Sequence, residues 1–289
     1  MPNLIGRHFR KMNGLGNDFV IFDGRSDKLT VSPAEARAIA SRRSGIGFDQ
    51  LIVLEPSGRA DLFMRILNAD GSESGACGNA TRCVARLIMD ETGLNEARID
   101  SQGGLLICAD GGAWGRVSVN MGKPRLDWQE IPLSAPASDT RAVPFLRPGL
   151  DPALPGHFSA VNMGNPHAVF FVTDADAHDL SRIGPLIERD TLFPERVNVS
   201  LAQVQSRSAI KLRVWERGAG ITKACGSAAC AAAAAAVRAD LTERRIAVRL
   251  PGGTLDMEVR GDGSVIMAGA IELEYEGRIE ARIFAGAAA

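Results

Sequence analysis

The first half of the chain alternates short apolar runs with polar turns that contain glycine. Apolar and polar residues alternate over 7–13 and 18–23, on either side of Gly14-Leu15-Gly16-Asn17, a pattern typical of a β-hairpin. Ser32-Pro33-Ala34-Glu35 has the capping-box sequence with proline at the first helical position, which predicts a helix over about 33–43. Further elements of this half are predicted as strands at 51–54, 62–67, 98–101, 105–109 and 115–120 and as a helix at about 78–91.

The second half repeats this order of elements. The predicted elements are strands at 158–161 and 168–172, a helix at 180–189, strands at 197–204 and 210–215, a helix at about 226–239, and four strand-like runs of which the last is 279–284. Residues 124–155 are proline-rich and nearly without period. We interpret that stretch as the connection between two domains.

The predicted helix of the second half indicates the architecture. Residues 228–236 are small and apolar on every side, and a helix that is apolar all round is a buried one. The alternative is a helix chosen only for the high helix propensity of alanine. Because strand-like runs flank it on both sides, we expect an α+β fold of two pseudo-symmetric domains. In each domain a curved, mostly antiparallel sheet would wrap round a central helix.

An internal duplication relates the two halves. Ala76-Cys77-Gly78-Asn79-Ala80 reappears as Ala224-Cys225-Gly226-Ser227-Ala228, and 225 − 77 = 148. The same offset of 148 places three further polar residues opposite polar partners, Asn17 opposite Asn165, Gln50 opposite Asn198 and Asn68 opposite Glu216. This predicts two copies of one domain. The expected N-terminal domain is 1–125 with 271–289 and carries Cys77, and the expected C-terminal domain is 126–270 and carries Cys225.

Length, charge and cysteine content narrow the class of protein. A chain of 289 residues is typical of two domains. Its formal net charge is −1 without long charged runs, so neither nucleic acid nor an anionic membrane is an expected partner. The longest apolar run, around 231–237, is far short of a membrane span. Five cysteines in a chain of this size favour a reducing cytoplasm over a disulfide framework.

A cysteine at a helix start can exchange protons. The helix N-terminus lowers a thiol pKa from its reference value of about 8.5, and its unpaired amides bind anions such as a carboxylate. Gly78 and Gly226 let the backbone approach a ligand closely. If two such thiols face one bound small molecule, one can remove a proton while the other delivers one to the opposite face. That chemistry inverts a stereocentre without a cofactor.

Other uses of the thiols have to be compared with this one. A structural zinc site needs ligand pairs at short spacing, but 83 − 77 = 6 and 230 − 225 = 5, so neither pair forms a Cys-x-x-Cys motif. No metal site is therefore expected, and Cys83, Cys108 and Cys230 are interpreted as core thiols. A cysteine-based metal or redox-sensing module is the alternative from another functional class, which metal analysis and thiol titration would reveal.

A set of motifs along nearly the whole chain resembles the diaminopimelate epimerase family in sequence and order. The motifs are Gly14-Leu15-Gly16-Asn17-Asp18-Phe19, Gly45-Ile46-Gly47-Phe48-Asp49-Gln50, Asn68-Ala69-Asp70-Gly71-Ser72, Cys77-Gly78-Asn79, Met163-Gly164-Asn165-Pro166-His167, Glu195-Arg196-Val197-Asn198, Glu216-Arg217-Gly218-Ala219-Gly220 and Ala224-Cys225-Gly226-Ser227. The resemblance implies interconversion of LL- and meso-diaminopimelate for lysine and cell-wall synthesis. It also implies that neither pyridoxal phosphate nor a metal is needed.

The resemblance also implies roles for single residues. Cys77 and Cys225 would be the acid/base pair, and His167 and Glu216 would tune them. The remaining implied roles are donors to the α-carboxylate (Gly78, Asn79, Gly226, Ser227), contacts to the distal end of the substrate (Asn17, Asn68, Asn165, Asn198, Arg217), a further substrate contact (Glu216), a pocket wall (Gln50) and a homodimer contact (Tyr275). The chain departs from the family pattern at Ile221, where glutamate is common, and at Ala80 and Ala228, where glycine is common.

Related enzymes give the nearest competing hypothesis. A proline or hydroxyproline racemase also uses two cysteines, but its smaller substrate would not need Arg217 and the asparagine cluster. The phenazine-type isomerases share the duplication but lack the cysteine pair.

Overall fold

The chain folds into two compact units, described here from a computed structural model that covers residues 4–75, 77–112 and 115–284. One unit comprises residues 1–119 and 269–289, and the other comprises residues 120–268. The boundaries expected from the sequence, after residues 125 and 270, lie six and two residues further along the chain (125 − 119 = 6, 270 − 268 = 2). Cys77 is in the first unit and Cys225 is in the second.

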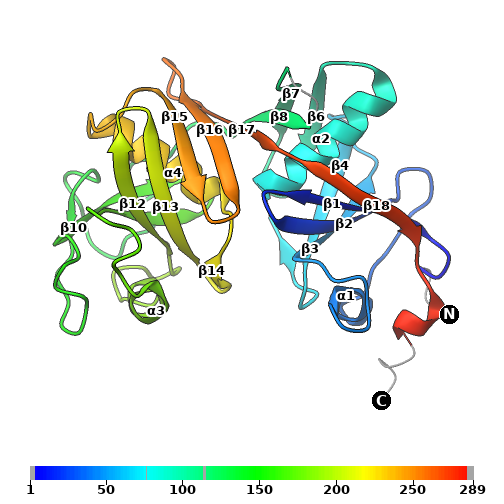
Figure 1. Cartoon of the computed structure of the whole chain (residues 1–289), viewed down its shortest axis with the longest axis horizontal. Helices are drawn as coiled ribbons and strands as arrows, with labels where there is room; N and C mark the ends of the chain where they lie inside the picture. Colours follow the sequence, from blue (N-terminus) through cyan, green and yellow to red (C-terminus); the bar gives the residue numbers. More distant parts are fainter. Residues whose placement is uncertain (1–3, 76, 113–114, 285–289) are drawn as a thin grey trace. The chain divides into compact units, whose positions relative to one another are not determined.

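The first unit contains two α-helices among its described residues, with a mixed sheet (Figure 1). Its elements are β1 (His8–Gly14), β2 (Asn17–Asp23), α1 (Pro33–Ala40), β3 (Gln50–Glu55), β4 (Leu62–Asn68), β5 (Glu73–Ser74), α2 (Gly78–Thr92), β6 (Glu96–Asp100), β7 (Leu106–Asp110), β8 (Arg116–Asn120), β18 (Glu272–Arg278) and the 3₁₀ helix η1 (Ala281–Phe284). The strand predicted at 279–284 is wrong, because the last strand ends at Arg278 and a 3₁₀ turn follows.

The second unit has the same succession of strands and helices, preceded by one short extra strand. Its elements are β9 (Val143–Pro144), β10 (His157–Asn162), β11 (Pro166–Phe171), α3 (Leu180–Glu188), β12 (Asn198–Ser206), β13 (Ala209–Glu216), β14 (Gly220–Thr222), α4 (Gly226–Arg238), β15 (Arg245–Leu250), β16 (Gly253–Val259) and β17 (Val265–Ala270). The two long helices begin at Gly78 and Gly226, which are 148 residues apart (226 − 78 = 148).

Strand pairing follows one pattern in both units. In the first unit β1–β2, β3–β4, β4–β5 and β6–β7 are antiparallel, whereas β2–β3 and β4–β6 are parallel. In the second unit β10–β11, β12–β13, β13–β14 and β15–β16 are antiparallel, whereas β11–β12 and β13–β15 are parallel. Phe19 pairs with Gln50 and His167 pairs with Asn198, again at the offset of 148. The predicted mostly antiparallel fold is confirmed.

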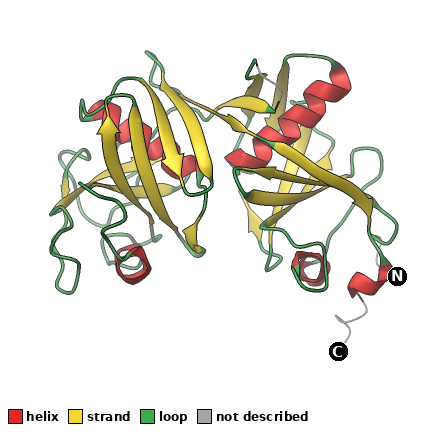
Figure 2. Cartoon of the chain, viewed as in Figure 1, coloured by secondary structure: helices red, strands yellow, loops and turns green. Residues whose placement is uncertain are grey.

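Burial explains the alanine run of α4. Residues Ala228 to Ala236 are all at most 2% exposed, and strands β10, β11, β12, β13, β15 and β16 all contact this helix. Figure 2 shows α2 and α4 against the strands of their own units. Small side chains are required where backbone approaches a helix from several directions, because the interior is packed to crystal-like density. The helix is therefore central, as its all-round apolar pattern predicts.

The first helix is shorter than predicted. The capping box is present, with Glu35 N donating to Ser32 Oγ and Ser32 N donating to Glu35, and Pro33 begins α1. The helix ends at Ala40 instead of continuing to residue 43. It stops there because the amides of Ile46 and Gly47 turn back to the carbonyl of Ile39. Gly47 makes this turn with a φ of 77°, a conformation that glycine adopts readily.

The interpretation of residues 124–155 as a domain connection is wrong. Strand β9 pairs with β10, and Ile131, Leu133, Val143 and Phe145 are buried in the core of the second unit. The ring of Phe145 lies 5.6 Å from that of Phe158 in an edge-to-face arrangement, a geometry that aromatic pairs favour. The apolar residues of this segment have no regular spacing, because they enter the core singly from a stretch with little regular secondary structure.

Among the described residues, no helix is long and apolar enough to cross a membrane.

Candidate active site

Both predicted catalytic thiols occupy the N-cap of a long helix. Cys77 precedes α2 with φ −150° and ψ 105°, and Cys225 precedes α4 with φ −129° and ψ 109°. The Cys77 sulfur accepts a hydrogen bond from Ala80 N at 3.5 Å. Gly78 and Asn79 are the first two residues of α2, and Gly226 and Ser227 are the first two of α4. Each unit thus presents a thiol beside backbone amides that lie at a helix start, where anions bind.

Two amides accompany Cys77 in the first unit. Asn17 Oδ1 lies 3.8 Å from Cys77 Sγ and accepts a hydrogen bond from Asn79 Nδ2 at 3.2 Å. The Oδ1 atom of Asn79 is buried and has no partner among the described residues. Because buried polar atoms are normally paired, this acceptor is a candidate contact for a polar ligand.

A second amide pair lies on the neighbouring strands of the same unit. Gln50 Nε2 donates to Asn68 Oδ1 at 3.1 Å, and Asn68 Nδ2 donates to Ser72 Oγ at 3.0 Å. Gln50 begins β3, which runs parallel to β2, where Asn17 is the first residue. The buried Oε1 of Gln50 also has no partner in the described part of the chain. The structure therefore brings these residues to the same edge of the sheet as Asn17.

Cys225 has a carboxylate beside it in the second unit. Glu216, the last residue of β13, accepts a hydrogen bond from Thr222 Oγ1 on β14. The same carboxylate accepts the hydrogen bond of the Cys225 thiol. Ser227 Oγ lies 3.5 Å from the sulfur. The hairpin of β13 and β14 thus places Glu216 against a cysteine that follows it by nine residues (225 − 216 = 9).

The pKa of the Cys225 thiol is well above its ordinary value, opposite to the lowering expected at a helix start. Burial is the main cause, and the negative charge of Glu216 and its hydrogen bond to the thiol raise the pKa further. A helix N-terminus contributes only about 0.3–1 kcal/mol toward the thiolate at an ordinary site. It is outweighed because burial and a neighbouring anion both disfavour a second negative charge. Glu216 therefore does tune Cys225, in the direction of the neutral thiol.

His167 is neutral and contacts an amide. Its ring is fully buried, and burial, with a further contribution from the charge of Arg217, lowers the pKa of His167 to about 3. His167 Nε2 and Asn165 Oδ1 are 2.8 Å apart, while the buried Nδ1 has no partner among the described residues. Since a neutral ring carries one N–H, His167 can hold Asn165 in place. The predicted tuning of a cysteine by His167 stays a prediction.

Asn198 and Arg217 are joined through the main chain. Asn198 Nδ2 donates to Pro166 O at 3.0 Å, and Asn198 Oδ1 accepts from Arg217 N at 2.9 Å. Asn198 is buried, so in this structure its amide positions the chain around Arg217. Arg217 itself is exposed, and its Nη1 donates to Glu195 O at 2.8 Å. A guanidinium held by one nitrogen keeps the others available for a carboxylate.

Two acidic residues support these groups and are missing from the sequence-based set. Asp49 Oδ2 accepts a hydrogen bond from Asn17 Nδ2 at 2.8 Å. Asp49 belongs to the motif 45–50, in which the sequence comparison gives a role to Gln50 alone. Glu188 at the end of α3 is 2% exposed and accepts from Trp215 Nε1 at 2.7 Å and from Gly218 N at 3.1 Å. Nothing in the sequence around Glu188 indicates this role, because a helical glutamate ordinarily faces solvent.

Tyr275 lies on β18. Its ring packs edge-to-face on Phe9 at 6.0 Å, and 47% of the residue is exposed. Strand β18 pairs with β1, and all but one of its seven residues are exposed. The predicted dimer contact at Tyr275 stays a prediction.

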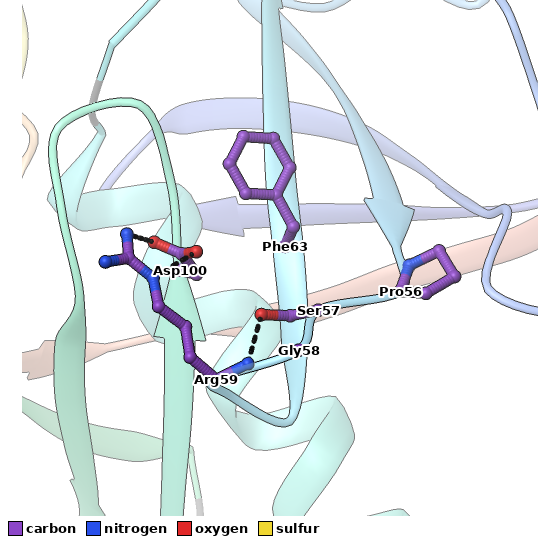
Figure 3. Close-up of a pocket in the computed structure, with 6 residues that line it drawn as sticks. All are labelled: Pro56, Ser57, Gly58, Arg59, Phe63 and Asp100. Atoms are coloured by element: carbon purple, nitrogen blue, oxygen red, sulfur yellow. Dashed lines mark hydrogen bonds and ion pairs between the residues drawn. The ribbon is translucent and has the colours of Figure 1, made fainter.

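A surface hollow elsewhere in the first unit contains none of the predicted site residues (Figure 3). It is lined by Pro56, Ser57, Gly58, Arg59, Phe63 and Asp100. Arg59 forms two hydrogen bonds with Asp100, Nε–Oδ2 at 2.8 Å and Nη2–Oδ1 at 2.6 Å. Because these charged groups satisfy each other, we assign no ligand to this hollow.

Comparisons with known proteins match the chain to diaminopimelate epimerases along most of its length. The family model of diaminopimelate epimerase matches residues 9–126 and 159–274. Diaminopimelate epimerase of Rhodospirillum centenum is 52% identical over 285 residues, which cover 97% of this chain and 94% of that protein. Diaminopimelate epimerase of Rhodopseudomonas palustris strain BisA53 is 48% identical over 291 residues, with full coverage of both chains.

A solved structure shares the fold at low sequence identity. A probable proline racemase from Agrobacterium radiobacter superposes with a TM-score of 0.68 at 13% identity, covering 97% of this chain and 94% of that one. At such identity the likeness concerns the fold alone, whereas the two sequence matches near 50% extend over nearly the whole length. With a family model that matches both units, the chain belongs to the diaminopimelate epimerase family.

Proposed function

We propose that Cys77 and Cys225 are the two acid/base groups with which this isomerase epimerises diaminopimelate. Members of its family interconvert LL- and meso-2,6-diaminopimelate in lysine and peptidoglycan-precursor biosynthesis, without pyridoxal phosphate or a metal. One observation carries the assignment. Both cysteines are the N-cap residue of the helix that follows equivalent strands in the two units.

The reaction needs one base and one acid on opposite faces of the α-carbon. A thiolate takes the α-proton, so that a C–H bond breaks and an S–H bond forms. The other thiol then gives its proton to the opposite face, and the negative charge ends on the second sulfur. Because burial and Glu216 keep Cys225 protonated, we assign Cys225 as the resting acid and Cys77 as the first base.

The helix starts are suited to the reacting end of the substrate. The amides of Gly78 and Asn79 and those of Gly226 and Ser227 would donate to the α-carboxylate. The unpaired Oδ1 of Asn79 would accept a hydrogen bond from the α-ammonium group. Carboxylate binding beside the α-carbon also favours the negative charge that develops there, since fixed donors stabilise developing charge.

The distal amino-acid end would be bound by the exposed Arg217 and by amides. Arg217 suits the distal carboxylate because a guanidinium pairs with it through two parallel hydrogen bonds. Asn68, Asn165 and Gln50 would take the distal ammonium and carboxylate groups, with Asn17 and Asn198 holding their neighbours. A substrate with only one carboxylate, such as proline, would not use Arg217.

The test is the conversion of LL-diaminopimelate in D₂O by the pure protein. We expect meso product that carries deuterium at one α-carbon, because the incoming hydrogen comes from a thiol that exchanges with solvent. Protium at that position would contradict a mechanism with two separate thiols. Activity that disappears on treatment with a chelator or hydroxylamine would contradict the cofactor-free chemistry.

Cysteine variants then test the assignment of the thiols. Cys77→Ser and Cys225→Ser should each reduce epimerisation by about 10²–10⁴-fold, the usual contribution of an acid/base group. Each should still eliminate halide from a halogenated substrate analogue, because that step needs only one base. Cys108→Ala is the matched control, since Cys108 is a buried strand residue outside both clusters. Near-normal epimerisation by either serine variant would disprove the assignment.

We also infer a cytoplasmic homodimer. The exposed face of β18 with Tyr275 supports pairing of two copies, and lysine biosynthesis supports the location. Sedimentation at micromolar concentration should show twice the 30.7 kDa chain mass, and Tyr275→Ala should shift it toward the single chain. A single 30.7 kDa species for the unmutated protein would refute the dimer.

A further inference from the structure

The side-chain amide of Asn17 has a fixed direction beside Cys77. Its Nδ2 donates to Asp49 Oδ2 at 2.8 Å, and a carboxylate can only accept hydrogen bonds. The NH₂ group of Asn17 therefore has to face Asp49, and its oxygen faces the other way. That oxygen lies 3.8 Å from Cys77 Sγ and accepts from Asn79 Nδ2.

Asp49 is itself held by a network of charges and main-chain groups. Arg42 Nη2 donates to Asp49 Oδ1 at 2.9 Å and to Asp18 Oδ1 at 2.8 Å. Asp49 N donates to Asp18 Oδ1 at 3.0 Å, while Asp18 N donates to Asp49 Oδ2 at 3.1 Å. Gly47 lets the chain pass close to Arg42, because a Cβ there would lie 2.9 Å from Arg42 Cγ. The Asp49 carboxylate thus has little freedom to turn.

We propose that Asp49 is a positioning residue that makes Asn17 present only an acceptor oxygen to the Cys77 thiol. This deepens the proposed function, because it assumes that Cys77 is one of the acid/base pair. An acceptor binds the S–H hydrogen and favours the neutral thiol, whereas an N–H donor would favour the thiolate. Both cysteines then face an oxygen acceptor, but only Cys225 faces a negative charge, that of Glu216, so the uncharged amide leaves Cys77 the easier thiol to ionise.

The exchange of Asp49 for asparagine should reverse the Asn17 amide. Arg42, the charged donor, would keep the single oxygen of the new side chain, which turns its NH₂ group toward Asn17 at the cost of the hydrogen bond from Asp18 N. Two donors cannot pair, so Asn17 would rotate and offer its own NH₂ group to the sulfur. Asn79 can follow this rotation, because its Oδ1 is unpaired and could accept from Asn17.

The experiment measures alkylation of Cys77 by iodoacetamide against pH, by peptide mass spectrometry on the full chain without substrate. Asp49→Asn should move the Cys77 profile to lower pH, with about fivefold faster alkylation below the midpoint, the effect of one hydrogen bond to the thiolate. The Cys225 peptide of the same sample is the internal reference and should not change. If Asp49 only supported the fold, its exchange would not shift the alkylation profile of Cys77 and leave that of Cys225 unchanged.

A double-mutant cycle separates this effect from the loss of a nearby charge. In an Asn17→Ala background Asp49→Asn should cause no further shift, whereas a direct charge effect would persist there. An unmoved profile in Asp49→Asn, or an equal shift in both backgrounds, would overturn the proposal. If Asp49→Asn fails to fold by circular dichroism, Asn17→Ala alone decides, because an unchanged Cys77 profile would show that Asn17 does not act on the thiol. Alkylation needs no turnover, so these results do not depend on whether Cys77 is catalytic.

Discussion

Replacement of Gly184 by alanine should destabilise the second unit and disturb the candidate site together. Gly184 lies inside α3, and a Cβ there would sit 2.5 Å from Cγ and Cδ2 of Trp215. Carbon atoms in contact are normally about 3.5–4.0 Å apart, so the indole would have to retreat by roughly 1 Å. The ring cannot retreat freely, because its Nε1 donates to the buried carboxylate of Glu188 at 2.7 Å.

The expected cost combines three effects. Overpacking costs about 1–3 kcal/mol, and weakening a hydrogen bond to a charged group costs about 1.5–3 kcal/mol. Alanine in place of glycine inside a helix returns roughly 0.5–1 kcal/mol. We therefore expect a net loss of about 2–5 kcal/mol in the free energy of unfolding.

Urea unfolding, followed by circular dichroism and by tryptophan fluorescence, measures this loss. With a slope of about 2 kcal/mol per molar urea, the transition should move by roughly 1–2.5 M. Gly261→Ala is the matched control, because no atom lies within 4 Å of the Cβ position there. The kcat/KM for diaminopimelate should also fall at least about tenfold, since Trp215 precedes Glu216 and Glu188 holds Gly218 N, and a displacement of about 1 Å can cost a hundredfold. A Gly184→Ala protein as stable and active as the control would refute the close packing of Trp215 on α3.

Three further predictions concern charges. Glu216→Gln removes one of the causes that raise the pKa of Cys225, so alkylation of Cys225 should shift to lower pH while Cys77 alkylation stays in place. Arg217→Ala should lower kcat/KM by at least about tenfold but the urea midpoint little, because a surface substitution costs about 0.5 kcal/mol or less. For Asp18, burial acts to raise the pKa, but the hydrogen bonds from Arg42 and Lys11 outweigh it and lower the pKa. The ionised Asp18 therefore stabilises the folded state above the unfolded-state pKa, and this contribution is lost on acidification. Asp18→Asn should accordingly flatten the decline in stability between about pH 5 and about pH 2, and an unchanged decline would contradict this.

Local signals in the sequence were enough for most elements. The capping box at Ser32 sets the start of α1, and glycine after each cysteine marks where α2 and α4 begin. The alanine run of α4 predicts a helix enclosed by strands, because only small side chains fit there. The core residues within 124–155 could not be predicted in this way, because single apolar side chains such as Phe145 in an irregular segment produce no periodicity.

The sequence by itself determined the duplication, the paired cysteines at helix starts, the family and so the reaction. The tertiary structure decided the surroundings of each thiol. Glu216 reaches Cys225 through the β13–β14 hairpin and raises its pKa, where the helix start alone predicts a lowered one. Asp49 reaches Asn17 from the position just before the neighbouring strand β3. Charge, burial and hydrogen bonding act over a few ångströms in space, and a linear pattern does not state which distant residues the sheet brings within that range.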